Sequence, residues 1–272
     1  MSGRFLFSLD VEDPRDAVPD GASYPARVPM LTAAYLDLLR RHGGRGTFFI
    51  VGAVARRHPD LVRTIAAEGH EIACHSDAHV RLDRQSPAQL RDDLLRSLDA
   101  LDSAGAGQVR GYRAPFFSLT GRTRWAYDVL ARLGFSYSSS VLGARNPIAG
   151  WAGFGERPCR IDGILEMPVT LLRLPRVPLG GAYFRLIPAP MIRRALRARA
   201  RAGEPVLSYH HPYDIDSGQP FAHPGFGRWS PFGLLMHAGR KAVLPRLEMV
   251  ADLGFRFEAY GDHAAALEGE GA

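Results

Sequence analysis

Hydrophobic and polar positions along the chain fall into two alternating patterns. Residues 4–9 and 46–52 are short runs of apolar, aromatic and β-branched side chains, which are typical of buried strands. Between them, residues 31–41 place apolar side chains at helical spacing, and His42-Gly43-Gly44 provides a helix end. The same patterns predict further strands at 71–73, 109–113, 166–169 and 205–209, and further helices at 59–68, 87–101, 122–133 and 244–253.

Strands that alternate with helices of this length indicate an α/β fold built on a parallel sheet or barrel. The chain shows no internal repeat of fixed period. Residues 143–190 are rich in Gly, Pro and Arg, with weak periodicity, and one alternative is a linker between two domains. The apolar residues interspersed there favour long loops instead. We therefore expect a single domain over residues 1–272, with a loop-rich insertion at about 143–190 and a frayed tail at 267–272.

The composition supports a globular protein without pointing to nucleic acid. Hydrophobic residues make up 46% of the 272 residues, which is enough for a sizeable core. The formal net charge of +6 suits acidic partners, but the densest basic run, residues 193–201, contains no aromatic side chain. A platform for single-stranded nucleic acid needs such aromatics. We expect this run to be a solvated helix face, with an anionic ligand or a peripheral membrane contact as the alternative.

The two cysteines, Cys74 and Cys159, do not form a disulfide framework, and a reduced, cytoplasmic protein is the simpler expectation. Cys74 adjoins a histidine, yet a buried structural thiol is expected there. The apolar stretch near the N-terminus is short and is interrupted by Asp10, unlike a signal-peptide core. Nowhere do 18 apolar residues follow one another, so no transmembrane span is expected.

Residues that can carry chemistry follow the predicted strands. An acidic cluster, Asp10-Val11-Glu12-Asp13, ends the first strand, and His75 follows the strand at 71–73. Arg113 and the pair His210-His211 end later strands. In parallel α/β barrels the carboxyl ends of the strands share one face, and that face carries the active site. Residues far apart in the sequence are therefore expected to converge.

His75 and His79, four residues apart, are candidate metal ligands. On one helical turn their Cβ atoms would lie about 5–6 Å apart, so both rings could reach one divalent ion. The alternative is two surface histidines without a shared ligand. A carboxylate from the acidic cluster would complete a site of two histidines and one carboxylate with an open position.

The acidic cluster is open to more than one interpretation. Asp13-Pro14 could be a helix cap in a solvated loop. Close carboxylates otherwise repel one another unless a cation neutralises them or one takes a raised pKa. Asp10 and Glu12 share a face if the strand continues, so one could bind metal while the other acts as a base. Arg113 could hold a carboxylate ionised through a bidentate hydrogen bond, and a histidine at the site's mouth suits general-acid work.

Together these motifs resemble the polysaccharide deacetylases, metal-dependent carbohydrate esterases with a nodulation-type deacetylase domain. The family's opening motif is matched by Ser8-Leu9-Asp10-Val11-Glu12-Asp13-Pro14, and its two-histidine motif by His75-Ser76-Asp77-Ala78-His79. Its Arg-x-Pro motif is Arg113-Ala114-Pro115, and its His-Pro motif is Tyr209-His210-His211-Pro212. The segments Gly180–Leu186 and His211–Asp216 further resemble the branch tied to bacterial exopolysaccharide systems.

This resemblance implies a distorted (β/α) barrel with about seven strands and the removal of N-acetyl groups from hexosamine units of a bacterial glycan or exopolysaccharide precursor. It implies that His75 and His79 bind the metal, with Glu12 as the first choice of carboxylate ligand and Asp13 as the alternative. Zinc is the expected metal, with cobalt or manganese as alternatives. Asp10 would be the general base, Arg113 would orient it, and His211 would be the general acid.

One departure from the family pattern favours an alternative function, and the family itself suggests a second. Ser138 stands where the branch typically has Asp, so an acidic partner of the site is expected to be absent. A catalytically weak glycan-binding protein is therefore one alternative. An amidase acting on a small cyclic amide is the other, because such enzymes share this domain.

Overall fold

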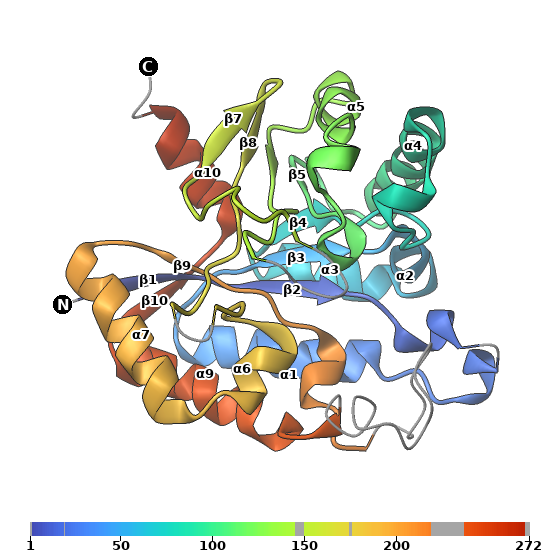
Figure 1. The fold of residues 1–272 in the computed structure, drawn as a ribbon. Helices are drawn as coiled ribbons and strands as arrows, with labels where there is room; N and C mark the ends of the chain where they lie inside the picture. The colour runs from blue at the N-terminus through green and yellow to red at the C-terminus, as the bar shows by residue number, and fades with distance from the viewer. Residues whose placement is uncertain (1, 19, 145–149, 174–175, 219–236, 270–272) are drawn as a thin grey trace.

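The fold is described from a computed structural model that covers residues 2–18, 20–144, 150–173, 176–218 and 237–269. Its main sheet has seven strands, of which all but the last run parallel to their neighbours (Figure 1). In spatial order these are β2 (Ser8–Val11), β3 (Thr47–Ile50), β4 (Glu71–Cys74), β5 (Gly111–Tyr112), β6 (Tyr137–Ser138), β8 (Ile164–Glu166) and β7 (Cys159–Ile161).

A second, three-stranded parallel sheet is joined to the first through the N-terminal strand. Its order is β10 (Phe255–Glu258), β1 (Gly3–Leu6) and β9 (Val206–Leu207). Phe7 is the single residue between β1 and β2, and an isolated bridge pairs Leu9 with His210 just beyond β9. The chain after β9 therefore runs alongside β2, which places the end of β9 next to the end of β2.

The expected α/β fold with about seven strands is confirmed, but a closed barrel is not detected. The backbone N–H of Thr170, beyond β8, donates to the carbonyl of Leu207 in β9 at 2.9 Å. Within the described part of the chain, no ladder of paired strands joins β7 or β8 to β9. The strands are short there, and the segment after β8 leaves the sheet as a loop.

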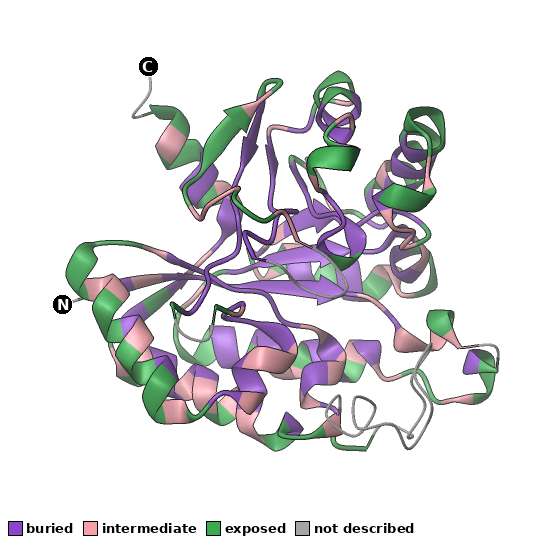
Figure 2. Cartoon of the chain, viewed as in Figure 1, coloured by how far each residue is buried: buried purple, intermediate pink, exposed green. Residues whose placement is uncertain are grey.

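Helices cover the outside of the sheets (Figure 1). They are α1 (Val28–Arg41), α2 (Gly52–Arg57), α3 (Pro59–Ala67), α4 (Pro87–Ser103), α5 (Ala126–Arg132), α6 (Gly181–Leu186), α7 (Ala189–Ala202), α9 (Val243–Asp252) and α10 (Tyr260–Gly269). Most strand residues are buried, as Figure 2 shows. Ser86 and Gln89 form a capping box at the start of α4, which explains why this helix begins sharply at Pro87. No helix in the described ranges is long and apolar enough to cross a membrane.

The predicted elements are present with shifted ends, and several others were missed. Neither β6 nor β10 nor α2 was predicted, and α10 continues to Gly269, past the start of the expected frayed tail. The Arg-rich run lies in α7, where Arg193, Arg194, Arg197 and Arg201 are exposed. Residues 143–190 contain β7, β8 and α6 besides loops, and 145–149 and 174–175 of this stretch lie outside the described residues.

Candidate active site

Six of the seven predicted site residues lie together at the carboxyl ends of the strands. Asp10 is in β2, Glu12 follows β2, and His75 follows β4. Arg113 follows β5, and His211 follows the bridge that extends β9. His79 lies on the same loop as His75, with ring centroids 4.9 Å apart. The shared face at the carboxyl ends of the strands therefore brings these residues together, as expected from the sequence.

The two histidines converge through a loop, so the expectation of a helical turn is wrong. Ser76 has a φ of 64° and His79 a φ of 53°, in the left-handed region that non-glycine residues rarely adopt. The carboxylate of Asp93 in α4 holds this loop, because it accepts from the backbone N–H groups of Asp77 at 2.8 Å and Ala78 at 3.1 Å. Such strained backbone is typical of functional sites when the surrounding structure holds it.

Glu12, His75 and His79 form a set that could hold a metal ion. One ligand atom from each residue lies within 4.8 Å of the other two. Oε2 of Glu12 is 3.7 Å from Nε2 of His75, and it also pairs with Nε2 of His79. Burial alone would raise the pKa of Glu12, but His79 and the other nearby histidines hold it well below its usual value. Glu12 is therefore an ionised carboxylate.

The tautomer of His75 fits metal binding. Nδ1 of His75 lies 2.8 Å from the backbone carbonyl of Arg113, which can only accept a hydrogen bond. Nδ1 must therefore carry a proton, and in the neutral ring the lone pair is then on Nε2, the atom that faces Glu12. A metal-binding histidine usually has this arrangement. The chemistry of the donor set thus suits a divalent ion with three protein ligands and an open position.

Asp13, the alternative carboxylate ligand, is occupied elsewhere. It caps the short 3₁₀ helix Pro14–Ala17 by accepting from the backbone N–H of Arg15 at 3.1 Å. The guanidinium of Arg15 also binds it, with the shortest distance 2.7 Å. The cap interpretation of Asp13-Pro14 is confirmed, and the carboxylate that faces the histidines is Glu12.

Asp10 and Arg113 form a buried pair beside the ligand set. Oδ1 of Asp10 is 2.5 Å from Nη1 of Arg113, and Oδ2 is 4.0 Å from Nε2 of His75. The expected bidentate contact is wrong, because the other guanidinium nitrogens donate to the carbonyl and hydroxyl oxygens of Ser139, at 2.9 and 3.0 Å. Burial would lower the pKa of Arg113, but Asp10 raises it overall, so the guanidinium stays charged.

His211 is held by the carboxylate of Asp214, a residue for which no role was predicted from the sequence. Nδ1 of His211 is 3.0 Å from Oδ2 of Asp214, and this oxygen also accepts from the backbone N–H of His211. Asp214 is buried and pairs with the buried guanidinium of Arg185 at 3.5 Å. Burial lowers the pKa of His211, but Asp214 and then Glu12 raise it to about 9. Nε2 of His211 lies 3.9 Å from Oε1 of Glu12.

Position 138 itself provides no carboxylate, and the hydroxyl of Ser138 donates to that of Ser140 at 2.7 Å. An acidic partner of the candidate acid is nevertheless present at another position, because Asp214 contacts His211. The signal in the sequence was an aspartate three residues after a histidine that follows a strand. Cys74 is a buried structural thiol, as expected, and burial raises its pKa to about 12.

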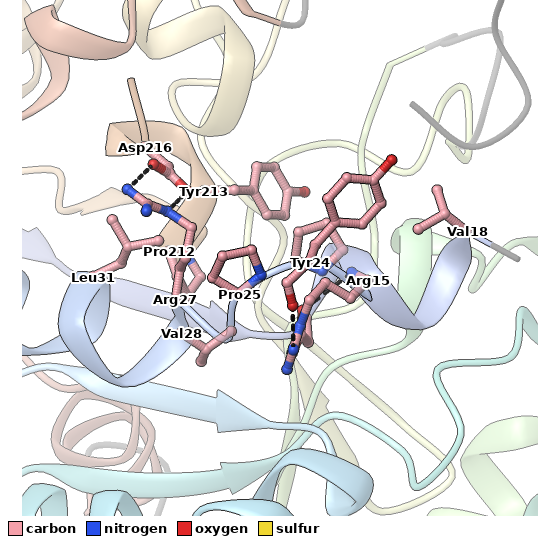
Figure 3. Close-up of a pocket in the computed structure, with 12 residues that line it drawn as sticks. Arg15, Val18, Tyr24, Pro25, Arg27, Val28, Leu31, Pro212, Tyr213 and Asp216 are labelled. Carbon is pink, nitrogen blue, oxygen red and sulfur yellow. Dashed lines mark hydrogen bonds and ion pairs between the residues drawn. The ribbon is translucent and has the colours of Figure 1, made fainter. Parts of the chain in front are cut away.

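A small cavity lies beside this site (Figure 3). Its volume is about 40 Å³, which suits water rather than a sugar ring. Segments near the N-terminus and the 3₁₀ helix Pro212–Ile215 line it, and Arg27 binds Asp216 at its edge through two contacts of 2.6 and 2.7 Å. Tyr213 is also part of the wall.

Two models of known protein families match this chain. Residues 19–138 match the family model described as "Polysaccharide deacetylase". This part of the chain is a polysaccharide deacetylase domain. Residues 139–260 match a second model, described as "Domain of unknown function (DUF3473)", and His211 and Asp214 lie in the part of the chain that this second model covers.

The domain is similar to rhizobial deacetylases over part of their length. A chitooligosaccharide deacetylase from Bradyrhizobium sp. (strain ANU 289) is 38% identical over 146 residues, 53% of this chain and 61% of that protein. The Sinorhizobium fredii enzyme of the same name is 34% identical, over 53% of this chain and 62% of that protein. The chain therefore spans about three fifths of the length of these curated relatives.

Solved structures support the fold of the deacetylase domain. A candidate polysaccharide deacetylase from Mycobacterium smegmatis superposes with a TM-score of 0.69 at 24% identity, covering 99% of this chain and 90% of that one. A family 4 carbohydrate esterase from Streptomyces lividans, solved with acetate, gives a TM-score of 0.54 at 19% identity, with coverages of 94% and 91%. At these identities the likeness concerns the fold alone.

Proposed function

We propose that this protein hydrolyses N-acetyl groups on hexosamine units of a bacterial glycan, with a divalent metal at Glu12, His75 and His79. The observation that carries the proposal is the convergence of this ligand set with the Asp10–Arg113 pair and the His211–Asp214 pair. The names of the rhizobial relatives support an N-acetylated glycan as the substrate class. Zinc is the proposed metal, and cobalt or manganese would fit the same donors.

When bound, such an ion supplies Lewis acidity toward the acetyl carbonyl and the attacking water. Asp10 acts as the general base in this proposal. Its Oδ1 is bound by Arg113, and its Oδ2 faces the ligand set, 4.0 Å from His75. Because the guanidinium occupies Oδ1, Oδ2 is the oxygen that can accept a proton from the water that attacks the carbonyl carbon.

His211 acts as the general acid. Asp214 accepts the hydrogen bond from Nδ1, which holds the ring and stabilises its protonated form, so Nε2 carries the proton that is transferred. As the carbon–nitrogen bond breaks, that proton passes to the leaving amine, and the acetyl group departs as acetate. Asp10 comes from β2 and His211 from the segment after β9, which runs alongside β2.

The two regions matched by different family models are proposed to work as one catalytic unit over residues 1–272. Support comes from the main sheet, in which β6 pairs with β8 across the boundary between the two matches. His211 and Asp214 also lie beyond this boundary, whereas Asp10, His75 and Arg113 precede it. An exopolysaccharide precursor is the finer substrate proposal, and it rests on the resemblance of residues 180–186 and 211–216.

The test is acetate release from N-acetylated chitooligosaccharides by protein loaded with zinc, cobalt or manganese. We expect release by the wild type and a loss of about 10²–10⁴-fold in kcat/KM for Asp10→Asn and for His211→Ala. Asp128→Asn, an exposed α5 residue paired with Arg132, is the matched control. Glycan binding without acetate release by metal-loaded protein would overturn the proposal in favour of a binding protein. Turnover of small cyclic amides alone would favour an amidase.

A further inference from the structure

We propose that Tyr213 is a positioning residue that fixes both the carboxylate ligand and the candidate acid. This inference rests on the metal site of the proposed function. The hydroxyl of Tyr213 donates to Oε1 of Glu12 at 2.9 Å, and its ring is stacked on that of His211.

The hydroxyl selects one orientation of the Glu12 carboxylate. Because Oε1 accepts from Tyr213, Oε2 is the oxygen that faces the histidines, 3.7 Å from His75 and paired with His79. Glu12 lies just beyond β2 and has no strand partner, so its side chain is not fixed by the sheet. A hydrogen bond from outside the ligand set restricts such a carboxylate and raises metal affinity.

The ring of Tyr213 fixes the plane of the imidazole of His211. The two ring centroids are 4.6 Å apart and the planes differ by 11°, so one face of His211 is covered. Asp214 restrains the same imidazole at Nδ1. A stacked face and a bonded edge together leave Nε2 pointing in one direction, toward the side of the site where Glu12 lies.

The segment that carries Tyr213 is itself held firmly. The guanidinium of Arg27 binds the carboxylate of Asp216 through two contacts, and the hydroxyl of Tyr35 donates to the backbone carbonyl of His211 at 3.2 Å. Figure 3 shows the Arg27–Asp216 pair and Tyr213 on the wall of the same cavity. These contacts join the segment around the 3₁₀ helix Pro212–Ile215 to α1 and to the residue before it, so Tyr213 lies on a segment that is held in place.

The experiment compares Tyr213→Phe with Tyr35→Phe. The first variant keeps the stacked ring and removes only the hydroxyl that reaches Glu12. The second removes a hydroxyl that braces the same segment without touching Glu12, so it controls for general loosening. Zinc and cobalt affinities of the metal-free proteins are measured by equilibrium dialysis, and the visible absorption spectrum of the cobalt-loaded form reports on the coordination of the ion.

We expect Tyr213→Phe to weaken metal binding by about 10–100-fold and to change the cobalt spectrum. Tyr35→Phe should retain the affinity and the spectrum of the wild type. If the wild type binds metal and Tyr213→Phe has the same affinity and the same spectrum, the inference is overturned and the proposed function stays intact. Equal weakening in both variants would also overturn it, since bracing alone would then explain the loss. A wild type that binds no metal would overturn both proposals.

Discussion

Arg113 contacts His75 with its backbone and Asp10 with its side chain. Its carbonyl accepts from Nδ1 of His75 at 2.8 Å, while Nη1 lies 2.5 Å from Oδ1 of Asp10. One residue thus sets the tautomer of a candidate metal ligand and the orientation of the candidate base. The two functions use different atoms, so a side-chain substitution can separate them.

We expect Arg113→Lys to impair acetate release without impairing metal binding. The backbone carbonyl remains, so His75 keeps the lone pair on Nε2. Lysine cannot reproduce the separate contacts that the guanidinium makes with Asp10, Ser8 and Ser139, so the base loses its orientation. A fall of about 10²-fold or more in kcat/KM at saturating metal is expected, with an unchanged dissociation constant for zinc. A parallel loss of metal affinity would contradict the separation.

Replacing each carboxylate in turn should identify the metal ligand. Glu12→Ala is expected to abolish zinc uptake, because it removes the carboxylate that faces both histidines. Asp13→Ala should retain uptake but lower the free energy of unfolding by about 1–2 kcal/mol, because it removes the cap of Pro14–Ala17. Metal content by elemental analysis and urea unfolding of the metal-free proteins measure the two effects. Loss of zinc from Asp13→Ala would refute the assignment.

Asp214 should matter for turnover more than for substrate binding. In Asp214→Asn the charge that stabilises protonated His211 is lost, and the amide can present a donor to Nδ1 in place of an acceptor. We expect kcat to fall by about 10²–10⁴-fold with little change in KM. Steady-state acetate release at saturating metal measures this split, with Asp128→Asn as the control. A change confined to KM would show that Asp214 acts on substrate binding instead.

Much of the fold and most of the candidate site follow from local sequence patterns. Helical and strand periodicity is a property of consecutive residues, so α1, α4 and the strands that precede Asp10 and His75 could be predicted. Because the carboxyl ends of parallel strands share one face, Arg113 and His211 are then expected near them without knowledge of any contact. This placement was predicted from polar residues that directly follow short apolar runs.

The rest depends on contacts between distant segments. The left-handed backbone at His79 is held by Asp93, sixteen residues from Asp77, and no local pattern at 75–79 shows this. Strand β6 has two residues, too few for a periodic signal. The contact between Tyr213 and Glu12 joins residues 201 positions apart, so only the folded chain shows it.

His210, which points away from the site, should make the protein sensitive to acid. It is fully buried between the rings of Phe7 and Phe184, and in the described structure neither ring nitrogen has a hydrogen-bond partner. Burial lowers the pKa of His210 to about 4, so below about pH 6.5 the unfolded chain binds a proton that the folded chain does not. Stability is therefore lost as the pH falls from about 6.5 toward 4, with a loss of about 2 kcal/mol at pH 5.

Urea unfolding of wild type and His210→Phe at pH 7.5 and pH 5 tests this effect of His210, because the other titrating groups are common to both proteins. The variant should lose about 2 kcal/mol less between the two pH values, and equal losses would show that His210 is protonated in the folded state as readily as in the unfolded state.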